Sequence, residues 1–530
     1  MLHTPRARRG MVVAPHALAS EAGLAVLREG GNAIEAAVAT ASTLAVVYPH
    51  MTGIGGDAFW LVKSADGPVR YIGGCGAAGA DPAHYASRNL ERIPTRGPDA
   101  ALTVAGAISS WSAALSLSER EWGGCLPVDR LLEEAIWHAE SGYPVTASQA
   151  AVTAARRDEL ADLPGFADTF LYEGAARPVG ALETQPRLAA TLRRLAADGL
   201  DGFYAGDLAA AIAADLERVG SPVSADDLRA HQVEQGEPLS CRVGSATVYN
   251  SRPPTQGLVS LIILALAERL GVADWPVDSP EAIHRIVEAT KQAFRLRDEE
   301  LHDPDMMSVP AEDFLDPAFL DELAGRVDPD KAEPWGEPGG PGDTTWFGVI
   351  DGQGNAVSVI QSIYHEYGSG LVLPESGICW QNRGLAFSLD PGSPRGLKRG
   401  RRPFHTLNPP LACFDDGRMM VYGTMGGDGQ PQTQAALFAR HVWNGDEPQV
   451  AVTAPRWLLG RTWGNASTSL KLEGRFEPSI GQRLAEMGHR LEIVDDYDEM
   501  MGHAGMIVRS PEGMLAGGAD PRGNGGVAGF

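Results

Sequence analysis

Gly-Asp-Thr-Thr-Trp at residues 342–346 continues directly into Phe-Gly-Val-Ile at 347–350, an alternating pattern that is typical of a strand. The chain just before it, 334–342, contains three prolines and four glycines, a composition that cannot continue a helix or a central strand. We therefore expect an exposed, cleavable segment followed by a strand with Thr344 at its start.

Thr344 becomes a strong candidate nucleophile if the peptide bond between Asp343 and Thr344 is cut. The new chain end then carries a hydroxyl and a free α-amino group on one residue, and an amine with a pKa near ~8 can take the hydroxyl proton at neutral pH. The hydroxyl would first attack its own preceding carbonyl to mature the chain, and later a substrate carbonyl to form an acyl-enzyme. The pattern therefore predicts acyl-transfer chemistry at Thr344.

An ordered series of short motifs runs through nearly the whole chain. It consists of Ala14-Pro15-His16, Gly30-Gly31-Asn32-Ala33, Gly53-Ile54-Gly55-Gly56-Asp57, Asn250-Ser251-Arg252-Pro253-Pro254, Asp343-Thr344-Thr345, Gly426-Gly427 and the segments 284–298 and 517–522. With these motifs in this order, the chain resembles the γ-glutamyltranspeptidase family of N-terminal-nucleophile hydrolases. One motif alone would be weak evidence, whereas an ordered series is specific.

The resemblance implies an α+β fold, the four-layer αββα sandwich of N-terminal-nucleophile hydrolases. It also implies that residues 1–343 become a large subunit and residues 344–530 a small one, together one αββα unit, and that two such heterodimers associate. Periodicity alone predicts only a mixture of helices and strands. Helices are expected at 19–28, 33–47, 105–118, 128–141, 185–198, 207–219, 281–299 and 431–443, and strands at 58–62, 69–72, 344–351, 356–364, 377–380, 411–414, 419–422 and 506–509.

Two further catalytic assignments follow from the same resemblance. Acyl transfer builds a tetrahedral oxyanion, and Gly426 with Gly427 supply backbone N–H groups that can approach it closely, since neither has a Cβ. Ser362 stands at the position of a second hydroxyl that orients the nucleophile during maturation. The alternatives are an ordinary glycine-rich turn for the two glycines and an outward-facing strand serine for Ser362.

Several positions depart from the family's binding site for a γ-glutamyl group. Such a substrate carries an ammonium and a carboxylate, and burying either one without a partner is costly, so a transpeptidase needs an acid and a guanidinium there. At the matching positions this chain has Tyr364 in place of an asparagine, Ala386 in place of the ammonium-binding aspartate, and no arginine within 76–81. The sequence therefore lacks the amino-acid clamp.

Other side chains stand where that clamp would be. The candidate substrate-binding residues are Tyr364, Arg383, His405 and Thr406. Arg383 is the best candidate to bind an anion because its planar fork matches a carboxylate, although an arginine in a loop is as often solvated. The runs 361–366 and 380–384 resemble the family branch that includes oxamate amidohydrolase. This branch implies hydrolysis of a small amide acid such as oxamate, giving oxalate and ammonia, without a cofactor.

Composition excludes several other classes of function. The formal net charge of -24 argues against a nucleic-acid partner, which needs clustered Lys and Arg. The five cysteines have no C-x-x-C spacing and the histidines no metal-ligand spacing, so we expect neither a disulfide framework nor a metal site. The longest uncharged apolar stretch, 258–267, is too short to cross a bilayer. We expect a cytoplasmic protein with a small-molecule amide substrate and no membrane partner.

The glycine-rich segment 53–57 does not match a nucleotide-binding loop. Ala58 occupies the place of the third glycine of G-x-G-x-x-G, and no Lys-Ser or Lys-Thr follows. We interpret the segment as a tight structural turn near the active cleft.

Three alternatives to a small-amide hydrolase stay open from the sequence. A γ-glutamyltransferase or glutathione hydrolase would use the same nucleophile, and so would a cephalosporin-type acylase that takes a larger acyl group. A pseudoenzyme scaffold would keep the fold without the chemistry.

Overall fold

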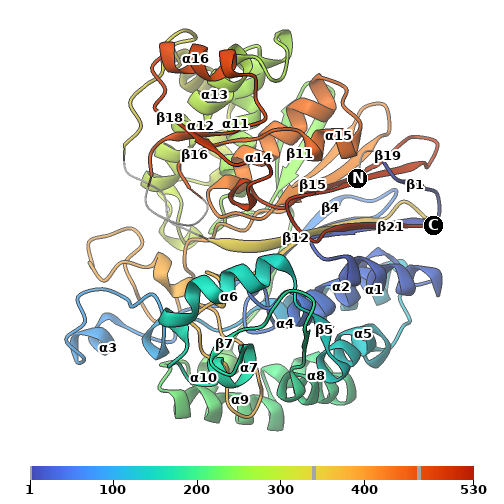
Figure 1. Ribbon diagram of the computed structural model, residues 1–530, viewed down its shortest axis with the longest axis vertical. Helices are drawn as coiled ribbons and strands as arrows, with labels where there is room; N and C mark the ends of the chain where they lie inside the picture. Colours follow the sequence, from blue (N-terminus) through green and yellow to red (C-terminus); the bar gives the residue numbers. More distant parts are fainter. Residues whose placement is uncertain (1–2, 337–341, 462–466) are drawn as a thin grey trace.

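Two seven-stranded antiparallel sheets form the centre of the computed structural model, which describes residues 3–336, 342–461 and 467–530 (Figure 1). The first sheet has the order β1 (Arg6–Ala7), β20 (Leu515–Ala519), β19 (Ala504–Arg509), β15 (Met419–Thr424), β14 (Leu411–Phe414), β11 (Ala246–Asn250) and β10 (Leu239–Val243). The second has the order β21 (Gly526–Gly529), β2 (Gly10–Ala14), β12 (Asp343–Asp351), β13 (Ala356–Tyr364), β3 (Asp57–Lys63), β4 (Val69–Gly74) and β9 (Glu234–Gly236).

Apolar side chains fill the space between the two sheets. Phe59, Trp346 and Ile360 of the second sheet pack in one cluster with Val421 and Ile507 of the first. Because side chains alternate along a strand, the remaining side chains of these strands point the other way, toward helices. Each sheet therefore has one face on its partner sheet and one face on a helical layer.

Helices cover the outer face of each sheet, so the layers run α, β, β, α (Figure 1). On the side of the second sheet lie α1 (Ala17–Arg28), α2 (Ala33–Val47), α3 (Pro82–Ala86), α4 (Ala107–Leu117), α5 (Val128–Ser141), α6 (Ala147–Leu160), α7 (Phe166–Phe170), α8 (Pro186–Asp198), α9 (Gly206–Val219) and α10 (Ala225–Ala230). On the side of the first sheet lie α11 (Gly257–Arg269), α12 (Pro280–Glu300), α13 (Pro317–Gly325), α14 (Gly429–Phe438), α15 (Pro448–Thr453) and α16 (Pro478–Glu486). The predicted four-layer αββα sandwich is confirmed.

The junction between α1 and α2 shows how the sequence specifies these elements. Asn32 is the N-cap of α2, and its side chain accepts the N–H groups of Ile34 and Glu35. Glu35 completes a capping box by accepting the N–H of Asn32 at 2.8 Å. Every residue of α2 is buried, so this alanine-rich helix lies directly under the central sheet. The two predicted helices at 19–28 and 33–47 are confirmed.

The hairpin formed by β12 and β13 crosses the middle of the molecule as the yellow strand and its neighbour (Figure 1). It is central because β2 pairs with one side of β12 and β3 with the outer side of β13. Its predicted boundaries, 344–351 and 356–364, agree with the structure. The predicted cleavable segment 334–342 falls mainly on residues 337–341, which lie outside the described residues.

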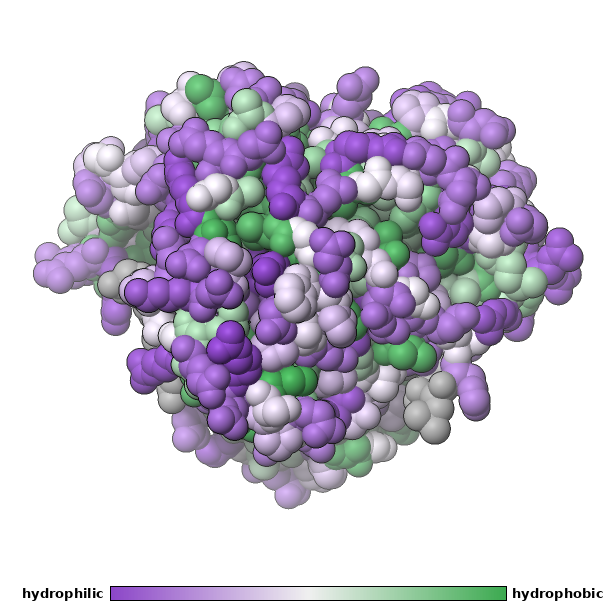
Figure 2. Space-filling model, turned by 90° about the horizontal axis from the view of Figure 1, so that it is seen from above, coloured by the Kyte–Doolittle hydropathy of each residue, from purple (hydrophilic) through white to green (hydrophobic). Residues whose placement is uncertain are grey.

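Smaller elements flank the sandwich. A three-stranded sheet contains β16 (Trp457–Leu459), β17 (Leu470–Glu473) and β18 (Leu491–Val494), and two short ribbons contain β5 (Tyr143–Pro144) with β8 (Leu182–Glu183), and β6 (Leu171–Tyr172) with β7 (Ala175–Ala176). The face seen from above is mostly hydrophilic, with apolar side chains gathered in small groups between charged ones (Figure 2).

Two predicted elements need correction. The strand expected at 377–380 is not part of a sheet, because its backbone makes only isolated bridges, Val372 with Cys379 and Gly55 with Trp380. The helix expected at 431–443 begins at Gly429 as α14 and changes to a π-helical turn at 439–443. The apolar stretch 258–267 lies inside the buried helix α11, and no helix within the described residues is long and apolar enough to span a membrane.

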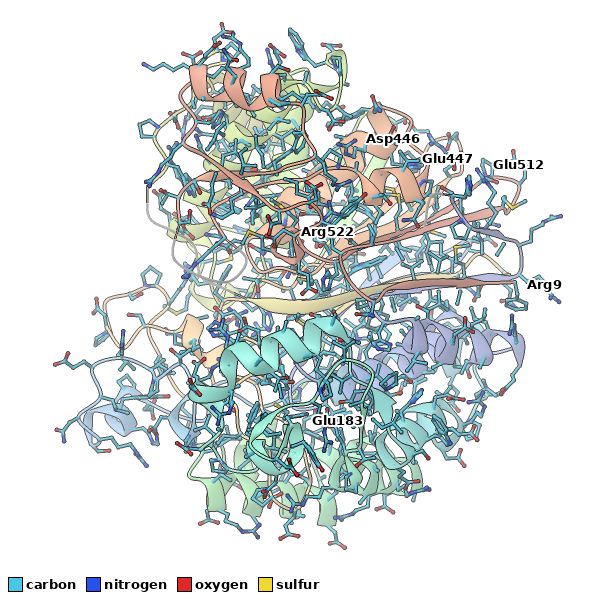
Figure 3. All side chains as sticks on the ribbon, in the orientation of Figure 1. Arg9, Glu183, Asp446, Glu447, Glu512 and Arg522 are labelled. Carbon is cyan, nitrogen blue, oxygen red and sulfur yellow. The ribbon has the colours of Figure 1, made fainter. Side chains whose placement is uncertain are left out.

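A buried ion network closes the C-terminal end of the sandwich. Arg522, labelled inside the upper half of the molecule in Figure 3, binds Glu473 through Nε at 2.6 Å and Asp520 through one Nη at 3.1 Å. Arg456 binds the other oxygen of Asp520 at 2.6 Å. The contacts of the family-like motif 517–522 therefore serve the fold, because they join β20 to β17.

Candidate active site

Thr344 lies where β12 departs from regular pairing. The register of the β12–β13 ladder shifts between Asp343 and Thr345, and such a bulge re-aims the side chain at that point. The Thr344 side chain is buried, and its Oγ1 accepts a hydrogen bond from Nε2 of Gln430, 3.4 Å away. The predicted nucleophile therefore stands at an irregular, enclosed point of the central sheet.

Ser362 lies on β13 at a constrained turn. Its Oγ accepts the N–H of Tyr364 at 2.8 Å, and Tyr364 has a φ of +82°, a value that residues with a Cβ rarely adopt. Gly56 packs against the same point, since a Cβ there would lie 2.1 Å from the carbonyl oxygen of Ser362. Ser362 is thus fixed from two sides, on the strand that pairs with β12.

The Gly426-Gly427 turn lies against the chain just ahead of the predicted cleavage point. Gly427 has a φ of +46°, and a Cβ on it would come within 3.1 Å of the backbone N and O of Gly342. Within the described residues, the N–H groups of Gly426 and Gly427 donate to no protein acceptor. These two N–H groups, beside the residue that precedes Asp343, are candidates to bind the oxyanion that the sequence analysis predicts.

Buried polar side chains hold this turn in place. Gln256 donates to the carbonyl oxygens of Gly427 at 2.8 Å and Thr406 at 2.9 Å. Arg297, from the end of α12, pairs with Asp428 at 2.8 Å, and both side chains are almost fully buried. Breaking a buried pair of this kind leaves an uncompensated charge, so the pair resists displacement of the turn.

Arg383 is the central feature of the predicted substrate side of the site. Its guanidinium lies 3.4 Å from the centre of the Tyr364 ring and donates to Oγ1 of Thr406 at 3.2 Å. The side chain is only 1% exposed, its Nε has no partner, and no carboxylate among the described residues lies within ion-pair distance of it. Burial lowers the pKa of Arg383, although the Tyr364 hydroxyl and the Asp57 carboxyl oppose this effect.

These contacts join the predicted residues into one site. Arg383 binds Thr406, whose carbonyl oxygen accepts a hydrogen bond from Gln256, and Gln256 in turn binds Gly427. On the other side, the ring of Tyr364 contacts Arg383, and its backbone pairs with the first residue of β12. One set of contacts therefore joins Arg383 both to the glycine turn and to the strand that carries the candidate nucleophile.

His405 is engaged differently from the other predicted binding residues. Its Nε2 lies 3.0 Å from Oδ2 of Asp57, and its ring packs edge-on against Phe59 at 4.8 Å. Burial, followed by the charge of Arg383, lowers the pKa of His405 well below its usual range. Burial also raises the pKa of the Asp57 carboxyl to about 7, although its hydrogen bonds and Arg383 act in the opposite direction. His405 is thus a neutral imidazole bound to a buried acid.

Comparison with known proteins places this geometry in a family. The family model "Gamma-glutamyltranspeptidase" matches residues 19–530. The chain belongs to the gamma-glutamyltranspeptidase family. It is 54% identical over 521 residues to "Oxamate amidohydrolase proenzyme" of Klebsiella pneumoniae, covering 98% of each chain. It is 29% identical to "Glutathione hydrolase proenzyme" of Escherichia coli, covering 98% of this chain and 92% of that one.

A solved structure of the gamma-glutamyltranspeptidase fold superimposes on nearly the whole chain. "Crystal structure of cephalosporin acylase from Bacillus halodurans" has a TM-score of 0.91 at 35% identity, with 100% of this chain and 97% of that chain covered. The likeness therefore supports both sheets and both helical layers together, and the predicted family and fold class are confirmed.

The structure shows what the residues do at positions where this member of the family departs from a γ-glutamyl binding site. Ala386, which stands where an ammonium-binding aspartate is expected, packs against the hydrophobic cluster under the first sheet. In segment 76–81, the N–H of Gly76 instead donates to the Asp57 carboxylate, and the N–H of Ala78 donates to the carbonyl oxygen of Arg401. Residue 386 therefore offers no carboxylate and segment 76–81 no guanidinium to an amino-acid substrate.

Two groups of three potential metal ligands lie close together among the described residues. They are Asp57, Cys75 and His405, and His284, Glu288 and His489. In the first group the nearby guanidinium of Arg383 disfavours a cation, and in the second Glu288 already pairs with Lys291 at 2.6 Å. We interpret both as hydrogen-bonded clusters and assign neither a metal.

The structure adds residues to the site that the sequence reasoning missed. Gln256 and Gln430 bind the oxyanion turn and Thr344, and Asp57 binds His405. One signal was available for Gln430: residues 429–434 are uncharged, rich in glutamine and placed directly after the two glycines. Asp57 ends the glycine-rich motif 53–57, which the sequence analysis interpreted as a structural turn, and Gln256 had no local signal, because its partners are distant in the sequence.

Proposed function

We propose that this protein is a self-processing N-terminal threonine amidohydrolase that converts a small amide acid such as oxamate into its diacid and ammonia. The observation that carries the proposal is the buried guanidinium of Arg383, which has no carboxylate partner among the described residues and contacts Tyr364, whose backbone pairs with the start of β12. The 54% identity to an oxamate amidohydrolase proenzyme over 98% of both chains supports it.

Maturation is the first acyl transfer in this proposal. The Thr344 hydroxyl adds to the carbonyl carbon of Asp343, and the N–H groups of Gly426 and Gly427 stabilise the oxyanion. The C–N bond then breaks, leaving Asp343 esterified to the Thr344 oxygen and the Thr344 nitrogen as an amine. Water hydrolyses the ester, which yields a large chain, 1–343, and a small chain, 344–530, that stay together as one αββα unit.

Substrate turnover repeats this chemistry with the new amine as the base. The Thr344 amine takes the proton of the hydroxyl, whose oxygen attacks the amide carbonyl of oxamate. Ammonia leaves with that proton and an oxalyl ester remains on Thr344. A water molecule, deprotonated by the same amine, then attacks the ester and releases oxalate.

Binding of the substrate carboxylate falls to Arg383. A guanidinium with no carboxylate partner offers two parallel N–H donors that match a carboxylate, and Tyr364 supports one face of it. Because the Tyr364 ring that contacts Arg383 also lies beside Gly342, two residues before Thr344, we propose that a short acyl group bound at Arg383 brings its amide carbon to Thr344. The missing acid at Ala386 removes the reason for an α-amino group on the substrate.

A hydrolysis assay across a panel of amides, followed by the amine that each substrate releases, tests this proposal. The matured enzyme is given oxamate and glutamine, which release ammonia, glutathione, which releases cysteinylglycine, and a glutaryl amide of the kind that acylases cleave, which releases its parent amine. We expect kcat/KM for oxamate to exceed that for glutamine and glutathione by about 100-fold or more, since a matched charged hydrogen bond is lost with each of them. Preference for glutathione would favour a glutathione hydrolase, and preference for the glutaryl amide an acylase.

The proposal extends to assembly and location. By analogy with the family, we propose two large and two small chains in a dimer of heterodimers, which light scattering on the matured protein tests directly. All five cysteines are free thiols, and the exposed Cys125 in particular favours a reducing compartment such as the cytoplasm.

A further inference from the structure

Asp57 accepts hydrogen bonds from four different parts of the chain. Its Oδ1 receives the N–H groups of Gly76 at 3.1 Å and Gly106 at 3.0 Å, and Nε2 of Gln381 at 3.1 Å. Its Oδ2 is bound to Nε2 of His405 at 3.0 Å. The carboxyl is fully buried, so these donors are its only solvation. A tight turn, as the sequence suggested for 53–57, does not require an acid at this place.

The contact with Asp57 fixes the tautomer and position of His405. With Nε2–H donated to Asp57, the Nδ1 atom is left to accept the N–H of Leu407, 3.5 Å away. The backbone of His405 is bound as well, since its N–H donates to Pro254 at 2.8 Å and its oxygen accepts from Gln256 at 2.9 Å. Side chain and backbone together therefore anchor the loop that contains His405.

The loop that contains His405 also contacts the side chain of Arg383. Thr406 follows His405 directly, and its Oγ1 accepts the hydrogen bond from Arg383. The chain of contacts from Asp57 thus runs through His405 and Thr406 to the guanidinium. Asp57 also acts through space, because it attracts Arg383 without lying within ion-pair distance.

We propose that Asp57 is a positioning residue for the anion subsite: through His405 and Thr406 it holds the Arg383 guanidinium in place, and its carboxylate balances that charge until a substrate carboxylate binds. This inference rests on the proposed function, since it assumes that Arg383 receives the substrate carboxylate. The remaining titratable neighbours of Asp57 are Cys75 and Tyr204, and burial keeps both uncharged at neutral pH by raising their pKa values.

This arrangement couples the binding of an anion at Arg383 to the binding of a proton by Asp57 and His405. When a carboxylate binds to Arg383, two negative groups share one buried cation, and the Asp57–His405 pair gains affinity for a proton. Binding of an anion is therefore favoured at a pH where the pair is protonated and weakened as the pH rises through the neutral range. A purely structural aspartate would not couple a proton to the anion in this way.

The test uses matured wild-type enzyme and the variant Asp57→Asn, which keeps the shape of the side chain and removes its charge. The readouts are KM and kcat for the best amide acid of the panel and the inhibition constant of oxalate between pH 6 and 8. For the wild type we expect the oxalate constant to rise about fivefold over this range, as one coupled proton predicts. For Asp57→Asn we expect the inhibition constant of oxalate to change less than about twofold over this pH range. Its KM should be about tenfold above the wild-type value, and its kcat should stay within about threefold of the wild-type value.

The matched control is Asp215→Asn, a buried aspartate far in sequence that accepts the N–H groups of Glu375 and Ser376. It should keep the wild-type pH dependence. The inference is overturned if Asp57→Asn retains the fivefold pH dependence, because the titrating group is then another one, such as the Thr344 amine. It is equally overturned if KM does not change.

A second variant covers the case in which Asp57→Asn does not mature. His405→Phe keeps an aromatic ring beside Phe59 and removes the hydrogen bond that connects Asp57 to the loop of Thr406, so KM should rise about tenfold and kcat should stay within about threefold of the wild-type value. An unchanged KM would contradict the inference. Failure of the wild type to release ammonia from any amide acid would instead contradict the proposed function, so the two failures are distinguishable.

Discussion

The proposed role of Arg383 is that a single residue sets the substrate class at a site whose other residues are shared with the family. The proposed nucleophile and glycine turn would serve any amide. Arg383, however, is fully buried and has no carboxylate partner among the described residues, and such a guanidinium is stable only if an anion or strong electrostatic support compensates it. Tyr364 and Asp57 supply part of that support, and the substrate carboxylate would supply the rest.

Replacement of Arg383 tests this role at the residue scale. Arg383→Lys keeps a positive charge and loses the planar fork, so kcat/KM for oxamate should fall about 30-fold, mostly through KM. Arg383→Met should lower it by about 1000-fold, because the substrate carboxylate is then buried without a partner. Steady-state kinetics measures both, with Arg418→Lys, a change at a partly exposed arginine bound to Asp416, as the control. Equal loss in the two Arg383 variants would refute a bidentate contact.

At the scale of single elements, regular segments could be predicted from the sequence and irregular ones could not. The boundaries of α5 and β13 agree with the prediction because apolar periodicity and turn residues act locally. The segment 377–380 has strand-like residues, yet its bridges go to two different segments, and the local pattern contains no information about that.

The same distinction between local and long-range contacts applies to the candidate site. Thr344 and the Gly426-Gly427 turn belong to contiguous motifs, so the sequence could single them out, and their catalytic roles stay predictions. The pair of Asp57 and His405 is separated by 348 positions, and Gln256 reaches Gly427 across 171, so only the folded chain brings them together. His405 in particular was predicted as a binding residue, whereas its side chain is bound to a buried acid.

The glycine turn offers a prediction for an element. In Gly427→Ala, a Cβ must fit a φ of +46° and a contact of 3.1 Å with the backbone of Gly342, so the turn has to shift. We expect self-cleavage to slow by about 100-fold, as expected for loss of an oxyanion donor, with the time course followed by denaturing electrophoresis. Gly445→Ala is the control, since Gly445 has a similar φ of +77° and no atom near its Cβ. Equal maturation rates for the two variants would argue against the turn's role.

The whole molecule depends on buried charge pairs as well as on its apolar layers. Burial alone would raise the pKa of Asp520, but Arg456 and Arg522 outweigh it and lower the pKa to about 2. A carboxyl whose pKa is lower in the folded than in the unfolded chain stabilises the fold at pH values above the unfolded pKa, which is near 4. This stabilisation is lost as the pH falls from about 4 to 2.

Acid unfolding tests this contribution. Asp520→Asn should cost about 2 kcal/mol of unfolding free energy at pH 7, and the variant should lose less stability than the wild type between pH 4 and 2. Urea denaturation followed by circular dichroism at both pH values gives the comparison. Glu512→Gln, at an exposed glutamate, is the control and should leave the midpoint unchanged. Parallel acid curves for Asp520→Asn and the wild type would contradict the assignment.

Self-cleavage at Thr344 is the claim on which the function depends, and intact-mass spectrometry of purified protein tests it most directly. The wild type should give two chains of about 36 and 20 kDa, the smaller one beginning at Thr344 with a free amine, and Thr344→Ala should give one full-length chain without amidase activity. Wild-type protein that hydrolyses amides while the bond between Asp343 and Thr344 stays intact would contradict the account.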